Sequence, residues 1–343
     1  MGAFSFAERE ARGTGGMAER RGKNQIVTIL GGSGFIGRYA VRALAKDGYR
    51  VRAACRRPDL AGFLQPMGDV GQVQPVQANL RFPDSVLRAV EGAHVVINAV
   101  GVLTSSGRQT FEAVHVDGAR AVARAAREAG AERFIHISAI GASASSPARY
   151  AQTKARGEAA VLEEFPGAVI LRPSIVFGPE DAFFNRFAAM AQVSPVLPLI
   201  GGGRTRFQPV FVGDVGAAVA AAAGGAGTPG AVYELGGPDV LTFRELLERT
   251  LAYAGRERGF LSLPFWLAKL QALLTWPLPN ALRPLTVDQV RLLQADNVVS
   301  AAAQAEGRTL AGLGVAAPQS IGAIVPMYLE RFRPKGQYSH YRG

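Results

Sequence analysis

The sequence predicts an α/β fold in which a doubly wound parallel sheet carries a smaller C-terminal lobe. From Gln25 onward, short apolar runs alternate with segments of helical periodicity, a pattern typical of a parallel sheet covered on both faces. A glycine-rich turn joins the first apolar run to the first helical segment. The 343 residues, 48% of them hydrophobic, are sufficient for one large α/β unit with an attached lobe.

Six strands are expected, and right-handed crossovers between them give the doubly wound order. They lie near residues 26–31, 50–55, 73–77, 94–99, 132–138 and 168–173. We expect four regions along the chain. These are a flexible N-terminal arm at 1–23, the sheet domain at 24–235 with about 178–208 contributing to the small lobe, the C-terminal lobe at 236–330, and a basic tail at 331–343.

The turn after the first strand has the pattern of a dinucleotide site. Glycines at this spacing let the backbone turn tightly, approach a pyrophosphate and pack the helix against the strand. The helix N-terminus adds free N–H groups and a positive dipole. A glycine turn alone is weak evidence, but its place between a strand and a helix favours a Rossmann-type site. The candidate cofactor-binding residues are Gly31, Gly34, Phe35, Ile36 and Gly37.

The end of the second strand indicates which dinucleotide is bound. About twenty residues past the turn, a carboxylate would bind the ribose 2′-hydroxyl of NAD. The strand 50–55 runs instead into Arg56 and Arg57, and a guanidinium there favours a 2′-phosphate through charge-assisted hydrogen bonds. NADP(H) is therefore the predicted cofactor, and a merely solvated strand end is the alternative.

Later strand ends supply further candidates. The turn Ala99-Val100-Gly101 follows the fourth strand, and Ser138 ends the fifth. Tyr150 and Lys154 share a face of the next helix, which is expected to run to about residue 162. An ammonium near a phenol lowers its pKa, so the tyrosine could pass a proton to a substrate oxygen during hydride transfer. Such a pair also occurs by chance on helix surfaces.

The net charge of +11 and the pI near 10.3 indicate an acidic partner. Without zinc-ligand spacing or a dense basic helix, nucleic acid ranks below a membrane surface or a protein. One cysteine, Cys55, and no apolar leader favour a cytoplasmic compartment. No apolar window reaches the roughly eighteen residues of a transmembrane helix. The histidines His94, His115 and His136 lack ligand company, so no metal site is expected.

An apolar, aromatic stretch at residues 260–276 is broken by Pro264 and Lys269. It is suited to a position in the membrane interface or in a groove of another subunit, with tryptophans at the polar boundary. The alternative is that these residues complete the core of the small lobe.

These motifs together resemble the extended, atypical branch of the short-chain dehydrogenase/reductase superfamily, over roughly residues 25–237. The resemblance implies that Tyr150 is the general acid/base, that Lys154 binds the ribose and that a serine polarises the substrate carbonyl. Ser138 is the first candidate for that serine. The other candidates are Ser143, Ser145 and Ser146. The resemblance also places Asn79 and Leu80 near the adenine and Pro173 beside the cofactor.

A narrower resemblance extends over most of the chain. Three regions are similar to the nucleotide-binding accessory subunits of respiratory complex I: residues 64–72, residues 178–187, and residues 285–290 with 296–299. The resemblance implies a bacterial relative of the mitochondrial subunit, which holds NADPH in the peripheral arm near the quinone region. Its expected partners are other complex I subunits, at the cytoplasmic face of the inner (plasma) membrane. The chain has no cysteine cluster for an iron–sulfur centre.

Two functions follow from the sequence. The favoured one is a non-catalytic assembly and stability subunit in which NADPH is a structural ligand. The other is a reductase of a small carbonyl or quinone-like substrate that uses NADPH, Tyr150 and Lys154.

Overall fold

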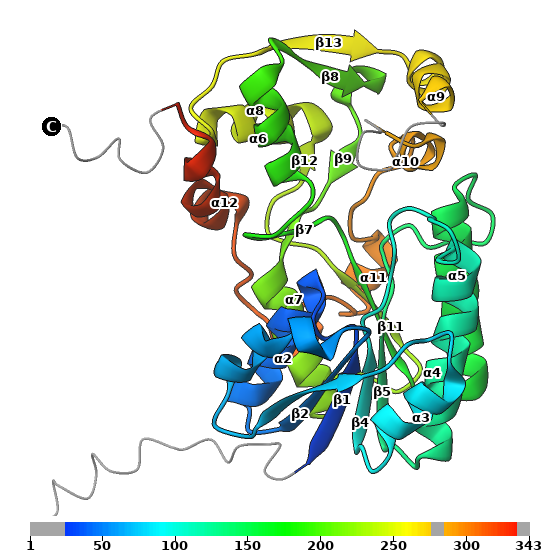
Figure 1. Cartoon of the computed structure of the whole chain (residues 1–343). Coiled ribbons are helices and arrows are strands. Elements are labelled where there is room, and N and C mark those ends of the chain that lie inside the picture. Colours follow the sequence, from blue (N-terminus) through cyan, green and yellow to red (C-terminus); the bar gives the residue numbers. More distant parts are fainter. Residues whose placement is uncertain (1–24, 276–284, 335–343) are drawn as a thin grey trace, which may run out of the picture.

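The computed structural model describes residues 25–275 and 285–334. The predicted N-terminal arm, Trp276 and tail residues 335–343 lie outside these ranges. Figure 1 shows two layered parts, with the large sheet in the lower part and a smaller lobe above the carboxyl ends of its strands.

Within the described residues, seven parallel strands form the large sheet, in the order β11-β6-β5-β4-β1-β2-β3. The bounds are β1 Ile26–Leu30, β2 Arg50–Cys55, β3 Val73–Gln77, β4 Val95–Asn98, β5 Arg133–Ile137, β6 Val169–Pro173 and β11 Val232–Leu235. The predicted doubly wound fold and its six strands are confirmed, and β11 adds an edge strand beside β6.

Helices cover both faces of this sheet (Figure 1). One face holds α2 (Phe35–Lys46) packed with α7 (Val212–Ala223). The other holds α3 (Pro83–Val90), α4 (Gly118–Glu128) and α5 (Arg149–Glu164). Because both faces are covered, alternate residues of one strand enter two different cores, which explains why neighbouring positions in β1 and β4 are both apolar.

The β4 strand shows this alternation. Val95 and Ile97 are fully buried beneath α2 and α7, whereas Val96 is fully buried on the opposite face, beside Phe134 of β5.

In the part of the chain that the structure describes, the small lobe has three pairs of short strands and several helices. Its strands are β7 Val176–Phe177 with β10 Val210–Phe211, β9 Arg206–Phe207 with β12 Leu241–Thr242, and β8 Val196–Ile200 with β13 Gly259–Leu263. Its helices are α6 Phe184–Val193, α8 Phe243–Tyr253, α9 Phe265–Leu274, α10 Val287–Leu292 and α12 Ile321–Leu329. An aromatic core that includes Phe177, Phe184 and Phe243 holds the lobe together.

The chain does not remain in the lobe after residue 236. Helix α11 (Ala301–Ala305) and the turn 311–313 return to the large sheet, where Leu310 and Leu313 join its core. The predicted lobe at 236–330 therefore includes a segment that packs on the large sheet, in the same core as α2 and α7. No helix in the described part of the chain has the length and apolar character to cross a membrane.

Candidate functional site

The glycine turn after β1 has the geometry of a phosphate cradle. Gly31 has a positive φ of 82°, and its carbonyl accepts the Gly34 N–H at 2.9 Å. A Cβ on Gly37 would lie 2.1 Å from that same carbonyl oxygen, so the close approach requires glycine. The N-cap of α2, Gly34, makes no side-chain capping bond, so the first N–H groups of the helix have no side-chain cap here. Phe35 and Ile36 begin that helix.

The two arginines after β2 differ in their surroundings. The Arg57 guanidinium is paired with Asp59, with Nη2 2.7 Å from Oδ2 and Nε 3.0 Å from Oδ1. Arg56 is exposed and has no hydrogen-bond or ion-pair partner among the described residues. The carboxylate of Asp59 therefore lies near the end of β2, but it is paired with Arg57. Arg56 is the guanidinium that is open to a phosphate.

The end of β4 lies beside the glycine turn, whereas the turn after β3 lies beside α4. The Ala99 backbone is in contact range of a Cβ built on Gly31. The buried Asn98 side chain accepts the Val100 N–H at 3.2 Å, which fixes the turn. Asn79 caps its own turn by accepting the Arg81 N–H at 3.2 Å. The neighbouring Leu80 side chain packs over Gly118 of α4.

On α5, Lys154 is buried and Tyr150 is half-buried. The Lys154 ammonium donates to the Ile137 carbonyl at 3.0 Å and lies close to Gly101. Burial lowers the pKa of Lys154 to about 8, although Glu158 opposes the shift. Burial raises the pKa of Tyr150 to about 12. The expectation that the ammonium lowers the pKa of the phenol is therefore wrong for this state, because desolvation of the phenol dominates.

His115 lies in the π-helical segment Glu112–Asp117 that leads into α4, and its ring has a structural role. Its Nε2 accepts the Val102 N–H at 3.1 Å, which leaves Nδ1 to donate to Thr153 Oγ1 at 3.1 Å. Its ring contacts Tyr150 edge-on, with centroids 5.4 Å apart. Burial and the nearby Lys154 charge lower the pKa of His115 to about 3, so the ring is neutral and fixes the wall against which Tyr150 packs.

Two buried polar atoms at the carboxyl end of β5 have no hydrogen-bond partner among the described residues. They are Nε2 of His136 and Oγ of Ser138. The Asn98 amide lies 3.3 Å from His136 Nδ1, which leaves Nε2 as the proton-bearing atom. Buried polar groups in folded proteins almost always have a partner, so these two atoms suit a bound ligand or an ordered water.

The sequence reasoning did not identify two residues that hold this region together. Asn297 accepts from Ser174 Oγ at 2.6 Å and donates to the Ile140 carbonyl at 3.2 Å, which fixes the loop after β5. The Asp288 carboxylate binds the start of α5 from the small lobe. Asp288 lies in residues 285–290 and Asn297 in residues 296–299, the two stretches that the resemblance singled out, and that was the available signal.

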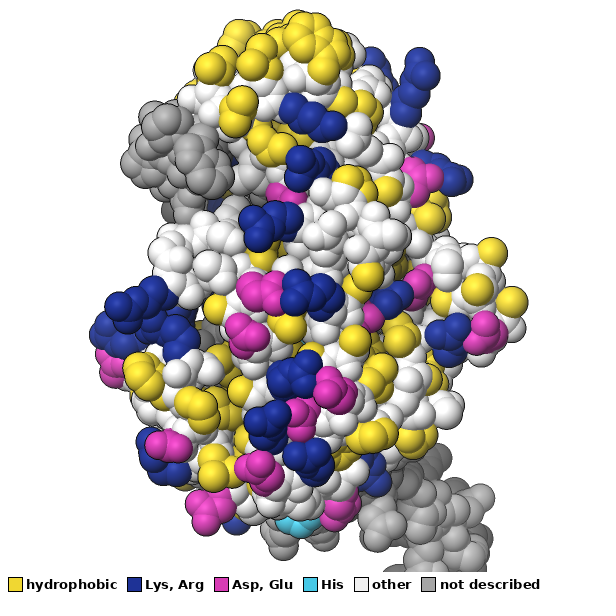
Figure 2. Space-filling view, turned by 90° about the vertical axis from the view of Figure 1, so that its right-hand side faces the viewer, with side chains coloured by type: hydrophobic (Ala, Val, Ile, Leu, Met, Phe, Trp, Pro, Cys, Tyr) yellow, Lys and Arg dark blue, Asp and Glu magenta, His cyan; other side chains and the backbone are white. Residues whose placement is uncertain are grey.

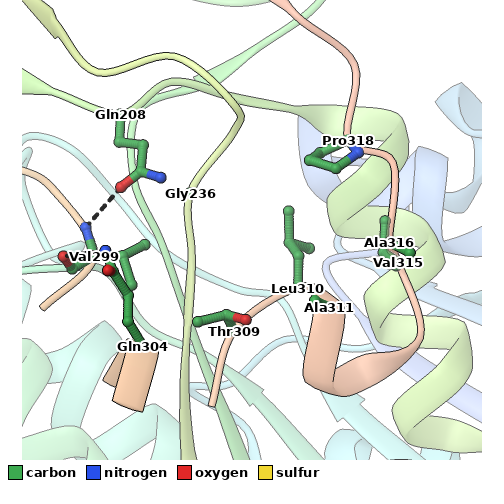
Figure 3. Close-up of a pocket in the computed structure, with 10 residues that line it drawn as sticks. All are labelled: Gln208, Gly236, Val299, Gln304, Thr309, Leu310, Ala311, Val315, Ala316 and Pro318. Atoms are coloured by element: carbon green, nitrogen blue, oxygen red, sulfur yellow. Dashed lines mark hydrogen bonds between the residues drawn. The ribbon is translucent and has the colours of Figure 1, made fainter. Parts of the chain in front are cut away.

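A separate cavity of about 270 Å³ lies between the end of β11 and the C-terminal segment (Figure 3). It is lined by Gln208, Gly236, Val299, Gln304, Thr309, Leu310, Ala311, Val315, Ala316 and Pro318. These residues carry no ionisable side chain and include none of the predicted cofactor-binding positions. The cavity therefore supplies no acid–base chemistry.

Residues 31–174 match the family described as NAD(P)H-binding, a range that runs from the glycine turn past β6. The fold is shared with the NADPH-dependent quinone oxidoreductase of Escherichia coli in complex with NADPH, at a TM-score of 0.69 and 20% identity, covering 88% of this chain and 99% of that one. The protein thus has a Rossmann-like α/β fold, and the part of it that carries the glycine turn has the sequence pattern of NAD(P)H-binding proteins.

A longer match identifies the family. The chain is 39% identical over 300 residues to NADH dehydrogenase (ubiquinone) 1 alpha subcomplex subunit 9, mitochondrial, of Arabidopsis thaliana, covering 84% of this chain and 74% of that protein. The chain therefore belongs to the family of this complex I accessory subunit. It is also 40% identical over 175 residues to a ceramide reductase of Caulobacter vibrioides, covering 51% of this chain and 54% of that protein.

Proposed function

We propose that this chain is a non-catalytic accessory subunit of respiratory complex I, in a bacterial complex. It binds NADPH tightly and supports assembly and stability of the peripheral arm near the quinone site, at the cytoplasmic membrane surface. The observation that carries the proposal is the extent of the match to the plant subunit. A match over 84% of the chain cannot be confined to the nucleotide-binding residues 31–174, so it includes part of the lobe as well.

The side chains and backbone groups at the candidate site are sufficient to hold NADPH. The glycine turn and the first N–H groups of α2 would receive the pyrophosphate, and Arg56 the 2′-phosphate. Lys154 would hold the nicotinamide ribose beside Gly101, with Pro173 at the end of the neighbouring strand β6. Bound in this way, NADPH stabilises the native fold by mass action.

The small lobe supports docking to another surface. Helix α9 buries Ala268 and Ala272 against the lobe but exposes apolar side chains on its other side. The exposed residues are Trp266, Leu270, Leu273 and Leu274. Figure 2 shows hydrophobic side chains gathered at the top of the molecule, the end that carries β13 and α9. In the described part of the stretch 260–276, one side of α9 completes the lobe and the other side is exposed, and this exposed side supports the proposed docking.

Arg56→Ala is expected to weaken NADPH binding about ten- to hundredfold and to leave NADH binding within about twofold, because the guanidinium meets only the 2′-phosphate. Isothermal titration of the purified protein with both nucleotides measures this. Arg57→Ala is the matched control and should cost NADPH less, since Asp59 already holds that side chain. An equal loss of NADPH and NADH affinity in Arg56→Ala would remove Arg56 from this role.

The subunit role itself is tested in native membranes. Mild detergent extraction, native-gel separation and mass identification should find this chain migrating with the large NADH dehydrogenase. In the assembled complex, Tyr150→Phe should leave NADH-to-quinone activity within about twofold, because a structural cofactor needs no proton donor. Migration as a small free protein, or loss of quinone reduction in an assembled Tyr150→Phe complex, would contradict the proposal.

A second candidate function is an NADPH-dependent reductase of a small carbonyl or quinone-like substrate. Two observations favour it. The buried hydroxyl of Ser138 has no hydrogen-bond partner among the described residues and follows Ile137, whose carbonyl accepts from Lys154. A ceramide reductase is 40% identical over half the chain. The bound cofactor would supply the hydride, and Tyr150 would donate the proton to the substrate oxygen. NADPH consumption with a carbonyl and quinone panel, abolished by Tyr150→Phe, would establish this function.

A further inference from the structure

The helix that carries Tyr150 and Lys154 is capped by a residue from a distant part of the chain. The N-cap position of α5 is Ala148, which has no side-chain oxygen. The carboxylate of Asp288 takes that place, accepting the Arg149 N–H at 2.7 Å and the Tyr150 N–H at 2.9 Å. A carboxylate at this position satisfies two otherwise unpaired N–H groups and interacts favourably with the helix dipole.

The Asp288 side chain is itself held in place by the small lobe. It belongs to the first turn of α10, where Thr286 and Gln289 form a reciprocal capping box. The side chain of Val290 in this helix is fully buried against Ile200 of β8 and Ala268 of α9. The position of the carboxylate therefore follows the position of α9 and α10 as a unit.

Helix α9 is also the element with the exposed apolar face. Its buried side contacts α10 and its opposite side carries Trp266, Leu270 and Leu273 in solvent. In Figure 1, α9 and α10 lie one above the other, on the side of the lobe above α5. We call this exposed apolar side of α9 the docking face. Contacts thus connect the docking face through α10 to the backbone of Tyr150.

We propose that Asp288 is a positioning residue that couples dinucleotide binding to the order of the α9–α10 unit. The inference rests on the proposed NADPH site. When NADPH holds Lys154, and with it α5, the capping bonds to Asp288 hold α10 and α9 in place. By linkage, whatever orders the α9–α10 unit tightens nucleotide binding by the same factor. The nucleotide would then determine whether the docking face is presented in an ordered form.

The test combines NADPH titration with hydrogen–deuterium exchange of the full-length protein, with and without saturating NADPH. In the wild type, NADPH is expected to slow exchange in residues 265–274 and 286–292 as well as in the glycine turn. Asp288→Ala should weaken NADPH binding about tenfold, and saturating NADPH should then protect the glycine turn but not the α9–α10 unit. Asp288→Asn, which keeps one acceptor oxygen, should lie between the two.

Asp296→Ala is the matched control. Asp296 also accepts a distant backbone N–H, from Arg206 at 2.8 Å, but among the described residues its carboxylate bonds only to Arg206 and not to α5. This variant should retain both the NADPH affinity and the protection of α9 and α10. If the wild type binds NADPH and the α9–α10 unit exchanges at an unchanged rate, the coupling is refuted and the proposed function stands. If the wild type binds no NADPH, the proposed function fails and the coupling fails with it.

Discussion

Gly157→Ala is expected to destabilise the protein by about 3 kcal/mol, at the upper end of what overpacking costs. Gly157 lies in the middle of α5, and a Cβ there would be 2.0 Å from the carbonyl oxygen of His115. That oxygen belongs to the π-helical segment Glu112–Asp117, so no side-chain rotation can relieve the clash. The two helices must separate, and the shift moves Tyr150 and Lys154 away from the strand ends.

Urea unfolding of the purified protein gives the stability change, and NADPH titration gives the effect on the site, where we expect a loss of at least about tenfold. Gly62→Ala is the control, because nothing lies within 4 Å of a Cβ at that position and its φ is not positive. It should stay within about 0.5 kcal/mol of the wild type. If Gly157→Ala had normal stability and normal NADPH affinity, the prediction would be wrong, and α5 could move away from the π-helical segment without a free-energy cost.

The large sheet could be predicted from the sequence because its strands are buried on both faces. Ile29 and Leu30 are adjacent in β1 yet enter opposite cores, so both are apolar, and the buried Thr28 beside them donates its hydroxyl to the Ala89 carbonyl. The glycine turn could also be predicted, because Gly31 has a positive φ and a Cβ on Gly37 would clash with the Gly31 carbonyl oxygen, so both positions require glycine. Local sequence carries both signals, and no distant contact is needed to interpret them.

The contacts that position the site could not be predicted in the same way. Asp288 caps a helix that begins 139 residues earlier in the chain, and its own surroundings show only a capped helix start. Gly157 looks like an ordinary helix glycine until the His115 carbonyl is placed against it. The parallel pairing of β13 with β8 likewise joins two short strands from distant parts of the chain. Such pairings follow from the packing of the lobe and have no periodic pattern.

The ion pair next to Lys154 could not be predicted from the sequence either. Arg172 of β6 and Glu158 of α5 form a bidentate pair, with Nε–Oε1 2.8 Å and Nη2–Oε2 2.5 Å. The Glu158 side chain is only 7% exposed and that of Arg172 23%. Glu234 of β11 lies 3.9 Å from the same guanidinium. This pair joins the helix that carries Tyr150 to two strands of the sheet, and Glu158 is the charge that raises the pKa of Lys154 against the effect of burial.

Arg172→Met is expected to destabilise the protein by about 3–5 kcal/mol, because it leaves the buried Glu158 carboxylate without its partner. The double variant with Glu158→Met should recover most of that loss, since two apolar side chains of similar size replace the pair. Arg156→Met is the exposed counterpart. Arg156 makes the same bidentate contact with Glu112, but both side chains are more than 40% exposed, so the cost should stay below about 1 kcal/mol.

Urea unfolding of the three variants and the wild type measures these differences. If Arg172→Met and Arg156→Met cost the same, burial does not determine the strength of the Arg172–Glu158 pair. If the double variant is stable but binds NADPH more weakly than the wild type, the pair serves the site more than the fold. We expect that outcome, because without Glu158 the burial of Lys154 is unopposed and its pKa falls below about 8. At neutral pH a larger share of Lys154 would then be uncharged where it should meet the nicotinamide ribose.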